Sequence, residues 1–192
     1  MPPPVPAYPS GYRLGSGDAP LQIEAFIDLE CPFSKKAWPT LLGLVNQEPS
    51  DRLAITAQLT VLADHRQSWD LTKAVTAVAD PDPLQGWKLI SHLYQNQDRY
   101  SSTACAAKTH QDVLALVATL IQEFDAALPT HELVKDIGDE SSAIASRAKT
   151  SIRYAISRGV WSTPTVFING SEVPQLESSS TLSDWRAFLA EL

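Results

Sequence analysis

The sequence predicts an α/β fold with a large all-helical insertion. Three features predict it: two strand-like segments flank a helix over 21–61, several helices without strands follow over 68–158, and a hairpin with a final helix closes the chain after residue 165. A strand, a helix and a second strand in that order imply parallel pairing with a right-handed crossover. We therefore expect a strand–helix–strand unit, a long helical block, and a hairpin followed by a final helix, in that order along the chain.

The first half of the fold is predicted by alternation with period two. Apolar side chains stand at every second position of the first segment: Leu21, Ile23, Ala25, Ile27 and Leu29. The same period recurs over 53–61, so both segments are predicted strands. A helix is expected between them, starting at Cys31 and Pro32 and ending near Val45. Proline suits the first turn of a helix, because its missing N–H would be unpaired there anyway.

The central segment shows only helical patterns. Apolar residues recur at helical spacing over 113–124 and 144–155, which predicts two amphipathic helices. Two shorter helices are expected over 69–79 and 84–97. An Asp-Pro-Asp-Pro turn separates them, and it would end one helix and start the next.

The last part of the chain returns to strand. Residues 165–168 are β-branched or aromatic, and the Asn-Gly pair at 169–170 is a strong hairpin signal, so a second strand is expected over 171–173. A final helix should follow, with Ser180 or Ser183 as its cap.

Length and composition bound the function classes. The 192 residues fit one domain, and 44% hydrophobic against 19% charged residues can supply a packed core. The 15 basic residues are scattered among 22 acidic ones, for a net charge of -7, which argues against nucleic acid as a partner. No segment approaches the roughly 18 to 20 apolar residues of a membrane span. The proline-rich residues 1–9 do not read as a signal peptide, so we interpret the protein as cytoplasmic, without a membrane partner.

The cysteines and histidines indicate neither a disulfide framework nor a metal site. Cys31 and Cys105 are far apart and lack zinc-ligand spacing, and the four histidines show no such spacing either. His65 is the histidine considered for catalysis, because it follows the second strand and the ends of parallel strands usually border a site.

Two separated motifs carry a family resemblance. Residues 26–34 read Phe-Ile-Asp-Leu-Glu-Cys-Pro-Phe-Ser, and 159–170 read Gly-Val-Trp-Ser-Thr-Pro-Thr-Val-Phe-Ile-Asn-Gly. Pro39, eight residues after Cys31, matches a proline that many thioredoxins carry. Over 12–192 the chain resembles the DsbA-like branch of the thioredoxin superfamily, as a single-cysteine variant.

The resemblance implies a thioredoxin-like fold with a large all-helical insertion and divides the chain into four parts. These are an extended N-terminal arm over 1–20, a strand–helix–strand first half over 21–66, the helical insertion over 67–158, and a second half over 159–192 with a cis-proline loop, a hairpin and a helix.

The position of Cys31 predicts a nucleophile independently of the family. A helix amino terminus offers unpaired N–H groups and the positive end of the macrodipole, and both favour a thiolate. Thiolate is the reactive form of cysteine. Lys35 would add to this effect, whereas Glu30 would oppose it or accept a proton. The polar run that follows Pro32 indicates that Cys31 is accessible rather than a buried, inert residue.

Ser34 is where the sequence leaves the family pattern. Redox members hold a second cysteine at this position, so the local disulfide of a dithiol enzyme cannot form here. Ala25 likewise replaces the buried acid that thioredoxins often use as a proton acceptor. Ser34 remains a candidate catalytic residue, either donating its hydroxyl to the Cys31 sulfur or capping the helix start.

The resemblance also assigns a substrate-binding surface. The Thr163-Pro164 bond would be cis and face Cys31, with the backbone of Thr163 turned outward to pair with an extended peptide or glutathione. A trans proline opening an edge strand is the alternative. Phe33, next to Pro32, and Trp161 would form an apolar mouth.

Three functions remain open. The first is monothiol disulfide exchange through Cys31, with protein or glutathione mixed disulfides as partners, no bound cofactor and glutathione as co-substrate. The second is a glutathione transferase or isomerase of the kappa type, which needs a carboxylate clamp for glutathione. The third is a redox-inactive peptide-binding or chaperone module. Cys105 is a further hypothesis, as a distant resolving thiol. The sequence predicts no oligomeric state.

Overall fold

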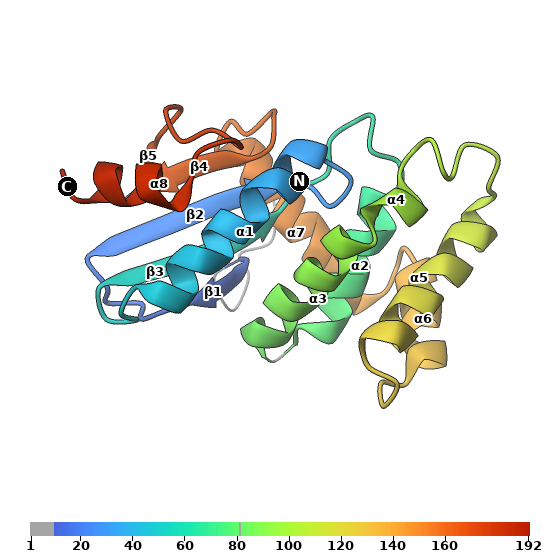
Figure 1. The fold of residues 1–192 in the computed structure, drawn as a ribbon. Helices are drawn as coiled ribbons and strands as arrows, with labels where there is room; N and C mark the ends of the chain where they lie inside the picture. Colours follow the sequence, from blue (N-terminus) through green and yellow to red (C-terminus); the bar gives the residue numbers. More distant parts are fainter. Residues whose placement is uncertain (1–9, 81) are drawn as a thin grey trace.

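A computed structural model describes residues 10–80 and 82–192 (Figure 1). The chain forms one five-stranded sheet in the order β1-β3-β2-β4-β5. The predicted arm over 1–20 lies partly outside the described residues. Within it, β1 (Tyr12–Leu14) pairs antiparallel with β3 at the sheet edge.

The centre of the sheet confirms the predicted strand–helix–strand unit. Strands β2 (Leu21–Ile27) and β3 (Leu53–Leu59) pair in parallel, and α1 (Pro32–Gln47) connects them. Both strands end two residues before the alternation does. One reason is visible at Asp28, whose main-chain oxygen accepts the hydroxyl of Tyr94 (3.1 Å), so the chain leaves the ladder there.

The second half of the sheet is antiparallel. Strand β4 (Thr165–Ile168) pairs with β2, and β5 (Ser171–Glu172) pairs with β4 through the Asn-Gly turn. Asn169 and Gly170 both have positive φ, the conformation that such a turn requires. The predicted hairpin is therefore confirmed, with its second strand one residue shorter than expected.

The final helix has a different cap from the one predicted. Helix α8 (Leu182–Leu189) starts after Thr181, whose hydroxyl accepts the N–H of Asp184, while the Asp184 carboxylate accepts the N–H of Thr181. Ser180 and Ser183, the predicted caps, lie one residue before and two residues after the observed cap, Thr181. The reciprocal pair satisfies two N–H groups, which a lone serine cap does not.

Six helices make up the described part of the segment between the two halves. They are α2 (Ser68–Val78), α3 (Pro83–Gln95), α4 (Gln97–Tyr100), α5 (His110–Phe124), α6 (Thr130–Gly138) and α7 (Ala143–Ser157). Helices α2 to α6 lie beside the sheet, α1 and α8 cover one of its faces, and α7 runs behind it (Figure 1). The helical insertion is confirmed, although neither α4 nor α6 is predicted from the sequence as a separate helix.

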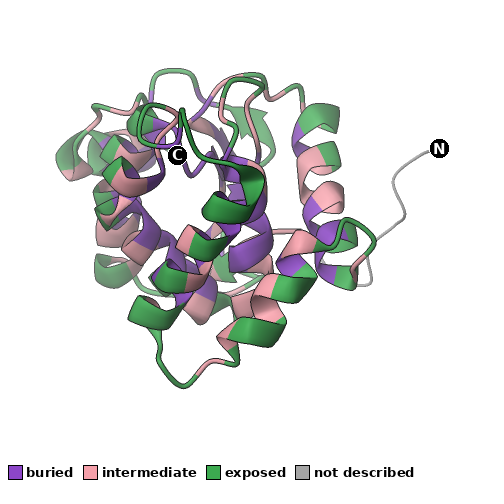
Figure 2. Ribbon diagram, turned by 90° about the vertical axis from the view of Figure 1, so that its right-hand side faces the viewer, coloured by how far each residue is buried: buried purple, intermediate pink, exposed green. Residues whose placement is uncertain are grey.

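Strand β2 serves two cores because its side chains alternate. Ile23 and Ile27 belong to the larger core, which includes Trp38 of α1, whereas Phe26 packs against Phe167 and Ala155 on the α7 side. Figure 2 shows buried segments on the inner sides of the helices and exposed ones outside. The sheet is thus held on both faces, and its edge at the start of α1 has a fixed position.

Candidate active site

Cys31 lies where β2 ends and α1 begins. It is the N-cap residue of α1, with an extended backbone (φ -69°, ψ 119°), and Pro32 is the first helical residue. No side chain caps this helix start. Cys31 therefore stands at the helix start that the sequence predicts, where the N–H groups of the first turn have no partner within the helix.

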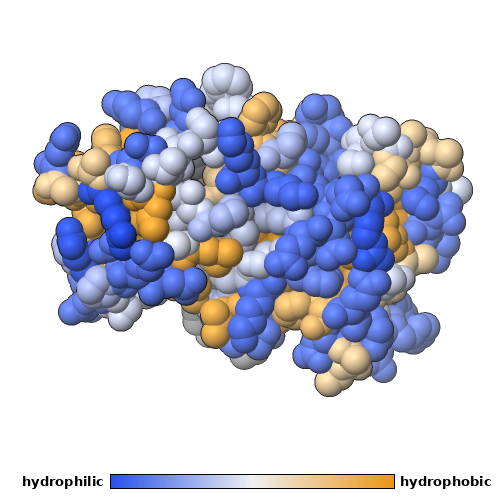
Figure 3. Space-filling model, in the orientation of Figure 1, coloured by the Kyte–Doolittle hydropathy of each residue, from blue (hydrophilic) through white to orange (hydrophobic). Residues whose placement is uncertain are grey.

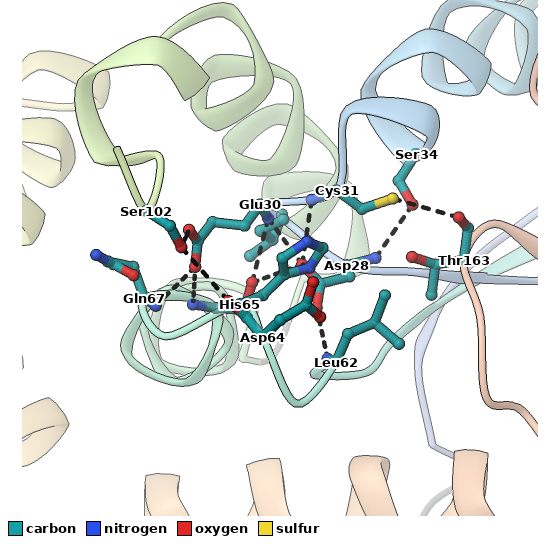
Figure 4. A network of polar contacts seen from close by, with 12 residues as sticks. Asp28, Glu30, Cys31, Ser34, Leu62, Asp64, His65, Gln67, Ser102 and Thr163 are labelled. Carbon is teal, nitrogen blue, oxygen red and sulfur yellow. Dashed lines mark hydrogen bonds and ion pairs between the residues drawn. The ribbon is translucent and has the colours of Figure 1, made fainter. Parts of the chain in front are cut away.

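The sulfur of Cys31 contacts the loop that precedes β4. Its Sγ lies 3.2 Å from the main-chain oxygen of Thr163 (Figure 4). The Thr163–Pro164 peptide bond is cis. Only a protonated sulfur can donate to a carbonyl, so this contact belongs to the thiol form. The expectation that the Thr163 carbonyl faces outward is wrong: it faces Cys31.

The sulfur is enclosed, whereas the rim of the site is open. Cys31 is 3% exposed, so the prediction of an accessible cysteine is wrong. Two distant segments cover it: Thr163 contacts its sulfur, and Gln97 of α4 donates to its main-chain oxygen (3.1 Å). In contrast, Phe33 is 60% and Trp161 is 84% exposed. Phe33 lies two residues after Cys31, and Trp161 lies two residues before Thr163. The two segments that meet at the sulfur therefore each carry an exposed apolar side chain.

Asp28 organises the main chain before the helix, a role that sequence reasoning missed. Its buried Oδ1 accepts the N–H of Glu30 (2.8 Å), the N–H of Cys31 (3.2 Å) and the hydroxyl of Ser68 (2.5 Å). Oδ2 accepts the N–H of Leu62 (2.7 Å). Four donors offset the cost of burying this carboxylate. The only signal in the sequence was an acid at the end of a buried strand, three residues before the cysteine.

His65 lies on the far side of the same carboxylate. Its Nδ1 is 2.9 Å from Asp28 Oδ1, an ion-pair distance, although the ring is not oriented for a hydrogen bond. The sequence singled out His65 from its place after the second strand, and the structure does bring it to this edge. Its contact is with Asp28, which in turn binds the N–H of Cys31.

Glu30 directs its charge away from the sulfur. In Figure 4 its side chain extends to the opposite side from the Cys31 sulfur, and Oε1 accepts the hydroxyl of Ser102 (2.8 Å). The expected opposition between this carboxylate and a Cys31 thiolate is thus reduced by distance. Within the described part of the chain, the hydrogen bonds of both oxygens go to residues 67, 68 and 102 and not to the sulfur.

The family now follows from a direct comparison. A sequence model of the family described as Thioredoxin matches residues 8–191. The chain belongs to the thioredoxin family.

Two curated relatives, the Na(+)/H(+) antiporters NhaA 1 of Mycolicibacterium gilvum and Mycolicibacterium vanbaalenii, are each 25% identical to it. The matches cover 81% of this chain and 23% of each antiporter, so the chain spans about a quarter of the length of these relatives. Among the described residues, no helix is long and apolar enough to cross a bilayer.

Solved structures share the fold. A candidate protein-disulfide isomerase from Pseudomonas syringae superposes with a TM-score of 0.77 at 20% identity, covering 93% of this chain and 97% of the other. Chlamydia trachomatis DsbA gives 0.73 at 16% identity over 98% and 93%. A periplasmic thioredoxin-like protein from Salmonella enterica serovar Typhimurium gives 0.67 at 20% over 96% and 91%. The thioredoxin-like fold with a DsbA-like helical insertion is therefore confirmed.

Ser34 and Ala25 mark the departures from the redox pattern of the family. Both are fully buried. Ser34 Oγ accepts the N–H of Asp28 (3.3 Å), so the side chain supports the preceding loop. Its predicted role as a helix cap is wrong, because Cys31 is the N-cap residue. Ala25 places no titratable group beneath the site.

Cys105 is the second free cysteine. It is buried after α4, and its Sγ lies 3.9 Å from the main-chain oxygen of Arg99. Its hypothesis as a resolving thiol stays a prediction. Within the described residues, no three His, Cys, Asp or Glu side chains are grouped as a metal site would need.

Proposed function

We propose that the protein carries out monothiol disulfide exchange, with Cys31 as the nucleophile. One observation carries the proposal: the Cys31 sulfur lies at the start of α1 and 3.2 Å from the main-chain oxygen of Thr163, next to Pro164. The free N–H groups of a helix start favour negative charge, which the sulfur carries as a thiolate before it attacks and regains when it leaves.

The first step exchanges one sulfur–sulfur bond for another. An extended substrate segment would pair with the backbone of Thr163, taking the place of the Cys31 thiol on that carbonyl. Phe33 and Trp161 would hold apolar side chains of the same segment, and Pro32 and Pro164 would shape the floor. Cys31 Sγ then bonds to one substrate sulfur, the substrate disulfide breaks, and the thiol proton goes to the departing sulfur.

The second step needs a thiol from outside the chain. Ser34 occupies the position where dithiol relatives hold a resolving sulfur, so the mixed disulfide on Cys31 waits for another thiol. Attack by glutathione on the substrate sulfur releases Cys31 with its proton and leaves a glutathione mixed disulfide on the substrate. Two exchanges occur, and no net oxidant or reductant is consumed.

Transfer from a glutathionylated peptide tests this function. We expect the wild-type protein to remove glutathione from the peptide in the presence of free glutathione, and Cys31→Ser to be inactive. Cys105→Ser is the matched control, because it removes a buried thiol outside the site and should keep the activity. A wild-type protein without exchange activity, or an active Cys31→Ser variant, contradicts the proposal.

The second candidate is a peptide-binding module without redox chemistry. The low exposure of Cys31 favours it, since a sulfur that stays covered cannot exchange. The face drawn in Figure 3 carries its hydrophobic residues in separate groups among polar ones, without one large apolar surface for a peptide. The exposed Phe33 and Trp161 are therefore the side chains that we assign to peptide binding. Binding of an unstructured peptide that is lost in Trp161→Ala but unchanged in Cys31→Ser, without exchange activity, would select this function.

A kappa-type transferase has less support. Two of the arginines available for a glutathione clamp are already paired: Arg99 lies 2.6 Å from Glu123, and Arg158 lies 3.4 Å from Glu24. Conjugation of glutathione to an electrophile is the direct assay for this activity.

The compartment decides which second thiol is available. The sequence predicts the cytoplasm, where glutathione is abundant, whereas one structural relative is described as periplasmic. In an oxidising compartment a protein thiol would take the place of glutathione. Fractionation of cells that express the chain, followed by detection of the protein in each fraction, tests the predicted location.

A further inference from the structure

The main chain around Cys31 is held by a side chain of the helical insertion. Gln97 of α4 is buried, and its amide nitrogen donates to the main-chain oxygens of Leu29 (2.9 Å) and Cys31 (3.1 Å). The second of these oxygens also accepts the N–H of Lys35 (3.1 Å), the first hydrogen bond of α1. The two N–H groups of the Gln97 amide thus donate to the carbonyls of Leu29 and Cys31, the residues before and after Glu30.

Two tyrosines extend this set of donors. The hydroxyl of Tyr94 donates to the main-chain oxygen of Asp28 (3.1 Å). That of Tyr100 lies 2.8 Å from the main-chain oxygen of Leu93 and 3.2 Å from that of Leu29, so its single proton is shared between α3 and the loop. Burial raises the pKa of Tyr94 and of Tyr100 well above the ordinary value, and neighbouring acids add to the shift. Both hydroxyls therefore keep their protons at any pH at which the protein is used, and they remain donors.

These contacts complete a frame around the loop before α1. Its N–H groups at Glu30 and Cys31 go to the carboxylate of Asp28, which comes from the loop itself. Its carbonyls go to α3 and α4, which lie about 65 to 70 positions later in the chain. A main chain fixed from both sides fixes the Cα–Cβ bond of Cys31 and so the direction of its sulfur. The three insertion side chains are neutral, so they orient the loop without adding charge.

We propose that Gln97, assisted by Tyr94 and Tyr100, is a positioning residue that sets the reactivity of Cys31. The proposal rests on the proposed function, since it assumes that Cys31 reacts. It assigns a task to the helical insertion: α4 holds the nucleophile in line with Thr163. A misplacement of about 1 Å can cost roughly a hundredfold in rate, so loss of the Gln97 donors should be visible in the chemistry of a single thiol.

The test measures alkylation of Cys31 by iodoacetamide at a series of pH values, with the modified peptide quantified by mass spectrometry. This readout separates Cys31 from Cys105 and needs no disulfide exchange, so it can fail independently of the proposed function. Gln97→Met keeps the length of the side chain and removes both donors. Gln58→Met is the matched control: Gln58 is also a buried amide with two hydrogen bonds, to Ser10 and Glu24, but it lies in β3.

We expect Gln97→Met to slow the alkylation of Cys31 by about tenfold and to shift its pH profile, while Gln58→Met leaves both unchanged. Tyr94→Phe should give a smaller change in the same direction, because it removes the donor to the main-chain oxygen of Asp28 and keeps the ring, and it decides the matter if Gln97→Met does not fold. The proposal is overturned if folded Gln97→Met reacts like wild type, if Gln58→Met produces the same change, or if Gln97→Met does not fold and Tyr94→Phe has the wild-type profile.

Discussion

Glu30 places its carboxylate at the amino end of α2, where Oε2 lies 2.7 Å from the main-chain nitrogen of Gln67. The same oxygen accepts the N–H of Ser68 (3.2 Å). Gln67 is the N-cap residue of α2 and provides no side-chain cap of its own, so a residue 37 positions away serves as one. The acid next to Cys31 in sequence thus stabilises a neighbouring helix, and its charge is satisfied by that helix's macrodipole.

Neutralising Glu30 should destabilise the fold. Glu30→Gln keeps the size of the side chain but loses the charge-assisted bonds, so the free energy of unfolding should fall by about 1 to 2 kcal/mol. Urea titration measures it. Glu132→Gln is the control, because Glu132 is in the first turn of α6 but exposed. Equal losses in the two variants would contradict the cap assigned to Glu30.

Asp28 should be the more sensitive acid. Both of its oxygens accept hydrogen bonds, so Asp28→Asn must turn an NH₂ group toward other donors, at Leu62 or at Glu30 and Cys31. We expect a loss of about 3 kcal/mol in the free energy of unfolding, measured with urea. Asp18→Asn, at an exposed position, should have little effect. A stable Asp28→Asn protein would remove Asp28 from the framework of the site.

Much of the fold was predictable from the spacing of apolar residues, because a strand or helix with one buried face repeats apolar side chains at its own period. Alternation predicted β2 and β3, and the Asn-Gly pair predicted the β4–β5 hairpin. Helix α6 was not predicted, since it has nine residues, starts after Pro129 without a side-chain cap, and buries only Ile137. Such a helix is held by its neighbours rather than by its own pattern.

The site was predicted only where one segment carries the information. The start of α1 identified Cys31, and the second motif identified Thr163. Burial of the sulfur was missed because the covering residues, Thr163 and Gln97, come from parts of the chain far from the polar run after Pro32. Asp28 was missed because it occupies a polar position of the strand alternation, where a side chain is expected to face solvent. In the structure its carboxylate instead accepts N–H groups of the loop that follows the strand.

Glu140 makes the helical insertion sensitive to acid. Burial raises the pKa of Glu140, but hydrogen bonds from Lys73 and Trp69 and the charge of Lys73 outweigh it and hold that pKa below its ordinary value of 4.5. A lowered pKa stabilises the native state above the unfolded value, and this contribution disappears as the pH falls through the native one.

The stability difference between wild type and Glu140→Gln should therefore be present at neutral pH and shrink as the pH falls below about 4.5. Urea unfolding at several pH values measures it. Glu177→Gln, at an exposed position, should show no such trend. A difference that stays constant with pH would show that Glu140 acts through its size and not its charge.

Two partly buried tyrosines should make the protein lose stability in alkali. Burial raises the pKa of Tyr12 to about 12. Burial and a hydrogen bond to Glu24 raise the pKa of Tyr154 to about 12 as well. A raised pKa gives stability that is complete below the unfolded value of about 10 and is lost as the pH rises through the native value.

Thermal melts and tyrosinate absorbance should thus change together between pH 10 and about 12. In Tyr154→Phe the melting temperature should depend less on pH in that range. Tyrosinate that forms near pH 10 while the protein stays folded would contradict the burial of these hydroxyls.

Restoring a second thiol tests whether Ser34 is what separates this chain from dithiol relatives. Ser34 lies one helical turn from Cys31, so Ser34→Cys places two sulfurs on the same side of the start of α1. After mild oxidation we expect a 31–34 disulfide, leaving Cys105 as the one remaining thiol, and after reduction a protein that reduces insulin disulfides without added glutathione. Thiol counting in the denatured protein gives the first result, and insulin precipitation gives the second.

Ser34→Ala is the control and should retain both native thiols under the same oxidation. If oxidised Ser34→Cys is folded and still has three free thiols, the geometry at this helix start does not suit a disulfide, and the loss of the second cysteine has a structural cause beyond one residue.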